Sequence, residues 1–546
     1  MKTNFKKIIA FVLSITCIFS SCAIGAFASQ NMDKTTTVPT VYVQGYGAGI
    51  YADKNDTSSQ KIVGEDVPFL TDGVLGDMLE QLIVPLLNGI TKGDYSEYNK
   101  IVVDTLSADL GRFALDKNGE PSDGSGNNAA RDTNVTNKNY WYNGKYDLYA
   151  YHLVYDWRVD PFVTAAELNA YIQQVKAATG SPKVNLVGRC LGANIVLAYL
   201  AQYGYDDVNA LNLYVGGLEG FEMVGALFSG QVVIDSDALD RFLQSSVSDN
   251  GDELISFLKS FVAIINVVKG LNLPIDIVSL IYDQVYTDII PNILRQTFGT
   301  MPAFWSFVGE EYYEAARAFN FPTAKEQAEY AGLIEKIDNY YNNVTLKTEE
   351  LILGAVDAGV PVYFTAKYGF TAMPICKEAD LHSDGTVSVT SQSLGATSAP
   401  LGKVFTSAYI EKAKKNGTDK YISADKYIDA STALLPDHVW FVKGSRHENM
   451  PECVDAMMAQ IFEATGFGEN KKYVTVEDFE DYPQFVCVVN NSGYEELVPL
   501  TEENASTGSE WDVSVFTHIS NLLQKTFNFV FEFISSLMEF INGITK

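Results

Sequence analysis

The most informative segment of the chain reads Val184-Asn185-Leu186-Val187-Gly188-Arg189-Cys190-Leu191-Gly192-Ala193. Its apolar start predicts a buried strand, and the residues that continue it as far as Tyr203 predict a helix. Gly188 and Gly192 stand two positions before and two positions after Cys190. In so sharp a turn from strand to helix, larger neighbours would collide with the central residue. The segment therefore predicts that Cys190 is held in a strained conformation above a sheet.

This position of Cys190 suits a nucleophile. Its side chain would project above the sheet at the positive end of the following helix, and the helix dipole and a nearby imidazole would favour the thiolate. The alternative is that Cys190 is a small buried apolar residue, which is the usual role of a lone cysteine. The strand and the helix on either side favour the nucleophile, because such a motif is confirmed by its structural context.

A thiolate of this kind needs a base, and the chain has only five histidines. His447 follows a strand predicted at Val439 to Val442 and precedes a helix that opens at Pro451. In a parallel sheet, the loop that holds it would emerge at the same edge as the turn at Cys190. His447 is therefore the candidate base. His438, which abuts the start of the same strand, is the alternative.

The acid that orients the base is expected on a third loop at this edge. A strand predicted at Val360 to Ala366 is followed by a long segment that contains Asp384-Gly385-Thr386-Val387. Asp384 opens a turn, and its carboxylate can bind an imidazole nitrogen and fix the tautomer of the ring. The chain order of nucleophile, acid and base supports Asp384 as the candidate acid.

A loop near the N-terminus is predicted to stabilise an oxyanion. The stretch from Val38 to Val43 reads as a short buried strand and leads into Gly45-Tyr46-Gly47. These glycines mark a loop whose backbone turns sharply or is approached closely. We expect the amide of Tyr46 and the amide of Leu191 to form the two donors of an oxyanion hole.

Strands and helices alternate on both sides of the Cys190 segment. A strand at Tyr146 to Val154, a helix at Ala165 to Ala178 and a further strand at Ala210 to Val215 predict a parallel sheet with helices on its faces. The alternation stops between residues 221 and 348, where the chain reads as helical and aromatic, and the last strand is expected at Val439 to Val442. This pattern predicts an α/β-hydrolase fold with a helical cap inserted into it.

The predicted organisation has five parts. Residues 1–28 are a signal peptide, 29–220 and 349–470 are the two parts of the α/β-hydrolase core, 221–348 are the cap or lid, and 471–546 are a C-terminal extension. A separate second domain is the alternative to the cap.

The extension ends in an amphipathic helix from Val513 to Asn542, whose apolar residues recur every three or four positions. Charged residues interrupt it too often for a membrane span. Two interpretations of this helix remain. It docks against the cap or a neighbouring chain, or it makes peripheral contact with a lipid surface.

The N-terminus predicts export. Lys2, Lys6 and Lys7 precede an apolar run, and Ala26-Phe27-Ala28 matches the pattern that a signal peptidase cuts. A lipid anchor on Cys22 is the alternative. Residues 1–28 contain three lysines and no acidic residue, so their removal changes the formal net charge from −29 to −32. Such acidity argues against nucleic acid as a partner, and we expect a secreted or cell-surface protein.

Four cysteines remain after the predicted cleavage, namely Cys190, Cys376, Cys453 and Cys487. They are too few and too scattered for a disulfide framework or a zinc site. The predicted chemistry therefore requires no metal and no cofactor.

Three segments together resemble the lecithin:cholesterol acyltransferase and phospholipid acyltransferase group of α/β hydrolases. They are Tyr155-Asp156-Trp157-Arg158-Val159-Asp160-Pro161, the Cys190 segment, and Asp384-Gly385-Thr386-Val387. The similarity runs from about Val38 to Gly466, interrupted by the predicted cap. In that group the nucleophile is serine, the acid lies in a Gly-Asp-Gly-Thr-Val-like motif, and the histidine follows near the C-terminal end.

The resemblance implies that Cys190, Asp384 and His447 take these three roles. Two departures are visible: cysteine replaces serine as the nucleophile, and Ser383 occupies the place of the glycine before the acid. The Asp-Trp-Arg segment is expected to be structural, with its tryptophan packed and its arginine paired.

These observations predict a secreted acyl hydrolase or acyltransferase that acts on an ester or thioester, with a lipid as the expected substrate, through an acyl-Cys190 intermediate. The alternative is a catalytically silent protein that uses its aromatic cap and tail to hold lipids or a partner at the cell surface.

Overall fold

The computed structural model describes residues 38–505 except 47, 65–66, most of 68–91, 128–140, 143–144, 147, 233–288, 373–375 and 492–493. The predicted signal peptide, the middle of the predicted cap and the predicted C-terminal amphipathic helix lie outside these residues. Within the described ranges, no helix is both long enough and apolar enough to cross a membrane.

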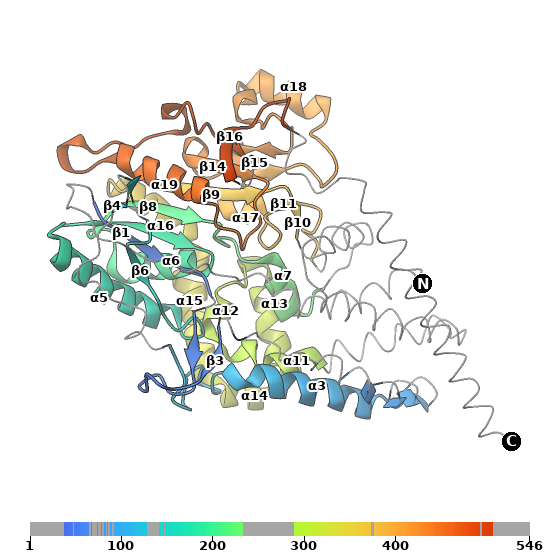
Figure 1. The fold of residues 1–546 in the computed structure, drawn as a ribbon. Coiled ribbons are helices and arrows are strands. Elements are labelled where there is room, and N and C mark those ends of the chain that lie inside the picture. The colour runs from blue at the N-terminus through green and yellow to red at the C-terminus, as the bar shows by residue number, and fades with distance from the viewer. Residues whose placement is uncertain are drawn as a thin grey trace.

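An eight-stranded sheet forms the centre of this part of the chain (Figure 1). From one edge to the other, the order of its strands is β6-β1-β7-β8-β9-β14-β15-β16. All neighbours in it are parallel except β15 and β16, which are antiparallel. The strands are β1 (Thr40–Val43), β6 (Tyr151–Leu153), β7 (Val184–Arg189), β8 (Val208–Tyr214), β9 (Val362–Tyr368), β14 (Val439–Lys443), β15 (Phe485–Asn491) and β16 (Tyr494–Pro499).

Helices flank the sheet and fill the long connections between its strands (Figure 1). They are α3 (Ser96–Leu110), α5 (Pro161–Thr179), α6 (Leu191–Tyr203), α7 (Glu222–Ser229), α11 (Ile290–Leu294), α12 (Pro302–Trp305), α13 (Glu310–Asn320), α14 (Ala324–Glu329), α15 (Ala331–Asn343), α16 (Thr348–Asp357), α17 (Val389–Ser393), α18 (Ser407–Asn416) and α19 (Glu452–Thr465). Four two-stranded ribbons are formed by β2 (Ile50–Tyr51) with β3 (Lys61–Val63), β4 (Trp141–Tyr142) with β5 (Lys145–Tyr146), β10 (Phe370–Thr371) with β11 (His382–Ser383), and β12 (Thr397–Ser398) with β13 (Ile428–Asp429).

The local sequence explains the central elements. Strands β7, β8, β9 and β14 are buried along their whole length, because helices cover both faces of a parallel sheet. Helix α5 begins where the Asp160 side chain accepts a hydrogen bond from the Phe162 amide, with Pro161 at the first helical position. It ends at Gly180, whose φ of 73° is the left-handed conformation that favours glycine. These features confirm the predicted parallel sheet flanked by helices.

The expectation that the sheet ends with the strand at Val439 to Val442 is wrong. Strand β15 pairs in parallel with β14, with Phe441 opposite Phe485, and β16 then forms the exposed edge. The apolar run from Phe485 to Val489 has the short, unbroken character of a buried strand, so the signal was present in the sequence. The sheet therefore continues into the region expected to be an extension.

The described residues of the segment 221–348 are mainly helical and share the core of the sheet domain. Asn194 of α6 donates hydrogen bonds to the Ser306 carbonyl and hydroxyl at 2.8 and 3.0 Å. The ring of Phe304 lies 6.0 Å from that of Tyr46 and 6.1 Å from that of Trp157. This segment therefore packs against the loop that follows β1 and against α6.

The Asp-Trp-Arg segment is structural, as predicted. Trp157 is buried and its indole nitrogen donates to the Ala48 carbonyl at 2.8 Å. The buried Arg158 guanidinium forms a bidentate ion pair with Asp156 and also donates to the Phe113 carbonyl. The segment thus fixes the loop after β1 to the rest of the core.

Candidate active site

The turn at Cys190 has the strained geometry that the sequence predicts. Strand β7 ends at Arg189, α6 begins at Leu191, and Cys190 between them has φ 54° and ψ −123°. A positive φ is uncommon for a residue with a side chain, and such strain concentrates at functional sites. The Cys190 amide donates to the carbonyl of Tyr214 at the end of β8, at 3.0 Å, and this bond helps to hold the strained residue.

The two glycines beside Cys190 allow close packing of the backbone. A Cβ atom at position 192 would lie 2.0 Å from the Val43 carbonyl oxygen, and one at position 188 would lie 2.8 Å from the Ala193 Cα atom. Real Cβ contacts are not this short, so neither position accepts a larger residue. The end of β1 is therefore pressed against the start of α6.

The loop after β1 reaches the nucleophile position. A Cβ atom at position 45 would lie 2.9 Å from Cys190 Cβ and 3.3 Å from Cys190 Sγ, so only glycine fits there. The Tyr46 ring is packed away between Trp157 and Phe304. Leu191 is the first residue of α6, where backbone N–H groups have no partner within the helix. The backbone of Gly45 and the amide of Leu191 thus both lie next to Cys190.

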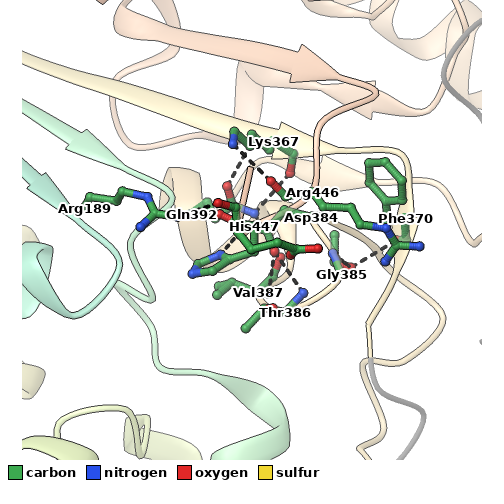
Figure 2. A network of polar contacts seen from close by, with 12 residues as sticks. Arg189, Lys367, Phe370, Asp384, Gly385, Thr386, Val387, Gln392, Arg446 and His447 are labelled. Carbon is green, nitrogen blue, oxygen red and sulfur yellow. Dashed lines mark hydrogen bonds and ion pairs between the residues drawn. The ribbon is translucent and has the colours of Figure 1, made fainter. Parts of the chain in front are cut away.

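His447 and Asp384 form a buried pair at the same edge of the sheet (Figure 2). His447 Nδ1 lies 2.6 Å from Asp384 Oδ2, and the His447 amide donates to the Asp384 carbonyl at 2.8 Å. Asp384 Oδ1 accepts from the amides of Thr386 and Val387 at 2.9 and 2.8 Å. The turn that follows Asp384 therefore fixes its carboxylate, and the carboxylate fixes the orientation of the imidazole.

The charges of this cluster favour a protonated imidazole. Burial lowers the pKa of His447, but electrostatic interactions and side-chain hydrogen bonds with Asp384 and Cys190 outweigh it and raise that pKa to about 10. His447 Nε2, the ring nitrogen that does not face Asp384, is buried. His447, Asp384 and Cys190 are each at most 1% exposed. The structure thus brings the three predicted catalytic residues into one buried cluster.

His438, the alternative base, lies elsewhere. It stands just before β14, at the amino end of the strand, and its Nδ1 lies 3.0 Å from the Val474 carbonyl. Its ring stacks on Tyr473 at 3.8 Å. Because the strands are parallel, this end of the sheet is opposite to the turn at Cys190. His438 therefore does not contribute to the cluster.

Two cations in the network were not singled out by the sequence analysis (Figure 2). Arg189 donates to the His447 carbonyl at 2.7 Å, and Lys367 of β9 donates to the Arg446 carbonyl at 3.1 Å. Both side chains are buried. A signal did exist for Lys367, because a lysine inside an otherwise apolar buried strand is rare unless it has a specific partner.

Aromatic side chains cover the cluster. Phe221, which precedes α7, lies edge-on to the His447 ring at 6.0 Å and stacks on Phe307 at 4.1 Å. The Phe221 amide also donates to the Phe307 carbonyl at 2.8 Å. The surroundings of the reacting groups are therefore apolar on the side of the segment 221–348.

Among the described residues, no group of His, Cys, Asp and Glu side chains is arranged to hold a metal ion. Within the part of the chain that the structure describes, Cys190 and Cys453 form no disulfide.

Comparison with known proteins supports the fold. A family model described as alpha/beta hydrolase fold matches residues 122–263, a range that includes α5, β7, the turn at Cys190, α6 and β8. No curated protein and no solved structure matches the chain. Together, this match and the mostly parallel eight-stranded sheet show that the chain has the α/β-hydrolase fold and support a hydrolase-type enzyme.

Proposed function

We propose that this protein is an exported acyl hydrolase or acyltransferase that forms an acyl-cysteine intermediate on Cys190. The observation that carries the proposal is the buried pair of His447 and Asp384, 2.6 Å apart, beside the strained Cys190 at the carboxyl edge of the sheet. A nucleophile, a base and a group that orients the base are the parts that covalent acyl transfer requires.

In the first half of the reaction, the Cys190 thiolate attacks the carbonyl carbon of an ester. A bond from sulfur to carbon forms, and the carbonyl electron pair moves to the oxygen. When this tetrahedral intermediate collapses, the bond from carbon to the leaving oxygen breaks, and the His447 imidazolium gives its proton to that oxygen as the alcohol departs. Asp384 stabilises the imidazolium and holds its Nδ1 proton.

In the second half, the neutral His447 imidazole removes a proton from water or from an acceptor alcohol. The resulting oxygen nucleophile attacks the thioester carbonyl carbon, and the bond from carbon to Cys190 sulfur breaks. The products are an acid or a new ester, and the thiolate and the imidazolium are restored. No metal and no redox partner is needed to balance these steps.

The negative oxygen of each tetrahedral intermediate needs hydrogen-bond donors. We assign this role to the amides of Leu191 and Tyr46, because the start of α6 and the loop after β1 flank Cys190. Preorganised backbone donors at the end of a helix dipole stabilise charge that develops during the reaction.

The substrate that fits this site best has an apolar acyl group. Phe221, Phe307 and Phe304 gather on the side of the site that the segment 221–348 covers. An acyl chain that displaces or packs against these rings removes apolar surface from water. This chemistry and the resemblance to lipid acyltransferases favour a lipid ester, met outside the cell or at its surface.

The test compares wild-type protein with Cys190→Ala and Cys190→Ser on p-nitrophenyl esters of short and long acyl chains. Cys190→Ala removes the nucleophile without adding bulk, and we expect kcat/KM to fall by about 10⁶-fold, to background. Cys190→Ser should hydrolyse esters more slowly than wild type, because a hydroxyl needs more help from the base than a thiol. Full activity in Cys190→Ala would contradict the proposal.

The alternative is a catalytically silent binding protein, and the complete burial of Cys190 and His447 is the observation that favours it. It predicts that wild type and Cys190→Ala both bind lipid vesicles and that neither turns over any ester in the series.

A further inference from the structure

Four consecutive backbone carbonyls around the candidate base are held by two buried cations. Lys367 Nζ donates to the carbonyls of Arg446 and Asn449, at 3.1 and 2.5 Å. Arg189 Nη2 donates to the carbonyls between them, those of His447 and Glu448, at 2.7 and 3.4 Å. Figure 2 shows the two side chains approaching the loop from different strands. Residues 446–449 are therefore fixed to both β7 and β9.

This arrangement connects the base to the nucleophile through the chain itself. Arg189 is the last residue of β7 and directly precedes Cys190, so its backbone is part of the strained turn. Its guanidinium reaches across to the carbonyl of His447. The Arg189 side chain therefore links the loop of His447 directly to the turn that holds the Cys190 sulfur.

The turn of the acid is tied to the backbone of Lys367. Gln392 of α17 accepts from the Lys367 amide at 2.7 Å and donates to the carbonyls of Lys367 and Val387 at 3.1 and 2.9 Å. Val387 in turn donates its amide to the Asp384 carboxylate. Lys367 therefore lies between the loop of the base and the turn of the acid.

We propose that Arg189 and Lys367 are positioning residues that hold the loop of His447, and with it the imidazole, in line with the Cys190 sulfur. The inference rests on the proposed roles of Cys190 and His447. Neither cation is assigned a contact with the substrate or a proton transfer.

The energetics support a positional role. Burying cations costs free energy that an apolar residue would not, so stability alone does not explain Lys367. Burial and the neighbouring charge of Arg189 lower the pKa of Lys367, while the carboxylates of Asp384, Asp455 and Glu448 raise it, and the result is about 7. A neutral amine still has two N–H bonds, which suffice for the two carbonyls. The two hydrogen bonds of Lys367 therefore persist on both sides of neutral pH.

The experiment measures how fast iodoacetamide alkylates Cys190 in the full-length protein, by mass spectrometry of the peptide that contains it, between pH 6 and pH 9. Lys367→Met keeps the length of the side chain and removes its donors. A displacement of about 1 Å can cost about 100-fold in rate. We therefore expect alkylation at pH 7 to slow by about 100-fold, and its pH profile to become that of an ordinary thiol. We also expect kcat to fall with little change in KM.

Lys471→Met is the matched control, because Lys471 is a partly buried lysine that donates to the Gly359 carbonyl, which lies before β9 at the opposite edge of the sheet. It should leave the alkylation profile unchanged. Arg189→Lys keeps the charge but loses the planar fork, so we expect a smaller loss in the same direction. This second variant decides the matter if Lys367→Met fails to fold.

The possible failures are distinguishable. If alkylation of wild-type Cys190 is slow and does not change in His447→Ala, the proposed function itself is overturned. If wild-type alkylation is fast and depends on His447, but folded Lys367→Met and Arg189→Lys retain the wild-type profile, only the positioning role is overturned. A lower thermal midpoint with an unchanged profile would assign the two cations a purely structural role, and would count against the proposal.

Discussion

Strand β14 has a histidine at each end, and the two differ in almost every respect. His438 precedes the strand, contacts a backbone carbonyl and stacks on Tyr473, and its pKa is lowered, mainly by burial. His447 follows the strand and lies against the Asp384 carboxylate, and its pKa is raised to about 10 although burial opposes this. The same side chain is thus held neutral at one edge of the sheet and charged at the other.

The charge state of each histidine therefore follows from the partner that its edge of the sheet supplies. The carboxyl edge collects the turn at Cys190, the turn of Asp384 and the buried Lys367, because every parallel strand ends there. The amino edge supplies His438 with a backbone carbonyl and an aromatic ring. Burial of charge is expensive, and its concentration at one edge marks that edge as functional.

The largest expected effect separates the two histidines directly. His447→Ala removes the proposed base, and we expect kcat/KM on a p-nitrophenyl ester to fall by about 10⁶-fold, nearly as far as in Cys190→Ala, because residues that act as one unit are not additive. His438→Ala should change kcat/KM by less than about twofold and cost on the order of 1 kcal/mol of stability through its lost hydrogen bond. Steady-state kinetics and urea denaturation measure the two quantities. Equal losses of activity in both variants would show that His447 has no special role in the reaction.

A smaller effect is expected from the acid. Asp384→Asn keeps the size of the side chain but removes the charge that holds the imidazolium, and we expect kcat/KM to fall by about 10⁴-fold. The pKa of His447 should drop once the carboxylate charge is gone. As the pH rises, the residual activity of the variant should therefore decline at a lower pH than the activity of wild type. A histidine titration by NMR measures this pKa, and a value still near 10 would show that Asp384 is not its main partner.

The smallest effect concerns stability at the carboxyl edge. Burial raises the pKa of Glu222, at the start of α7, from 4.5 to about 7, and its carboxyl accepts a hydrogen bond from the Ser388 hydroxyl. The folded state therefore binds more protons than the unfolded state between these values. The stability that this group contributes is present below about pH 4.5 and is lost as the pH rises to about 7.

Glu222→Gln keeps an acceptor for Ser388 and cannot ionise. We compare the urea midpoints of the variant and of wild type at pH 5 and at pH 8. We expect the stability of the variant relative to wild type to be greater at pH 8. A difference between the proteins that does not change with pH would contradict the burial of an ionising carboxyl at this edge.

Much of the fold could be predicted from the sequence. The turn at Cys190 could be predicted from its own sequence. Its close backbone contacts require glycine at two positions, and glycines stand at those positions. The alternation of apolar runs located β7, β8, β9 and β14 to within a few residues. Strand β15 is not predicted because its short apolar run lies beyond the last predicted helix. Periodicity alone does not assign such a run to a sheet.

The candidate site was predictable only where residues stand beside recognisable turns. Asp384 and His447 follow strands, and topology then brings them to one edge. Lys367 could be noticed as a lysine inside a buried strand, but the carbonyls that Arg189 and Lys367 bind leave no mark in the sequence. The interaction of Phe221 with His447 joins residues more than two hundred positions apart, and no local pattern encodes it.

If Cys190 carries the acyl group, the acyl-enzyme can be trapped during the first turnover. Wild-type protein is mixed with an excess of a p-nitrophenyl ester, quenched in acid within the first turnover, digested and analysed by mass spectrometry. We predict that the peptide containing Cys190 gains the mass of the acyl group, that the gain is lost on treatment with hydroxylamine, and that it is absent in Cys190→Ala. Rapid ester turnover with no acyl group on Cys190, and the same turnover in Cys190→Ala, would contradict the account.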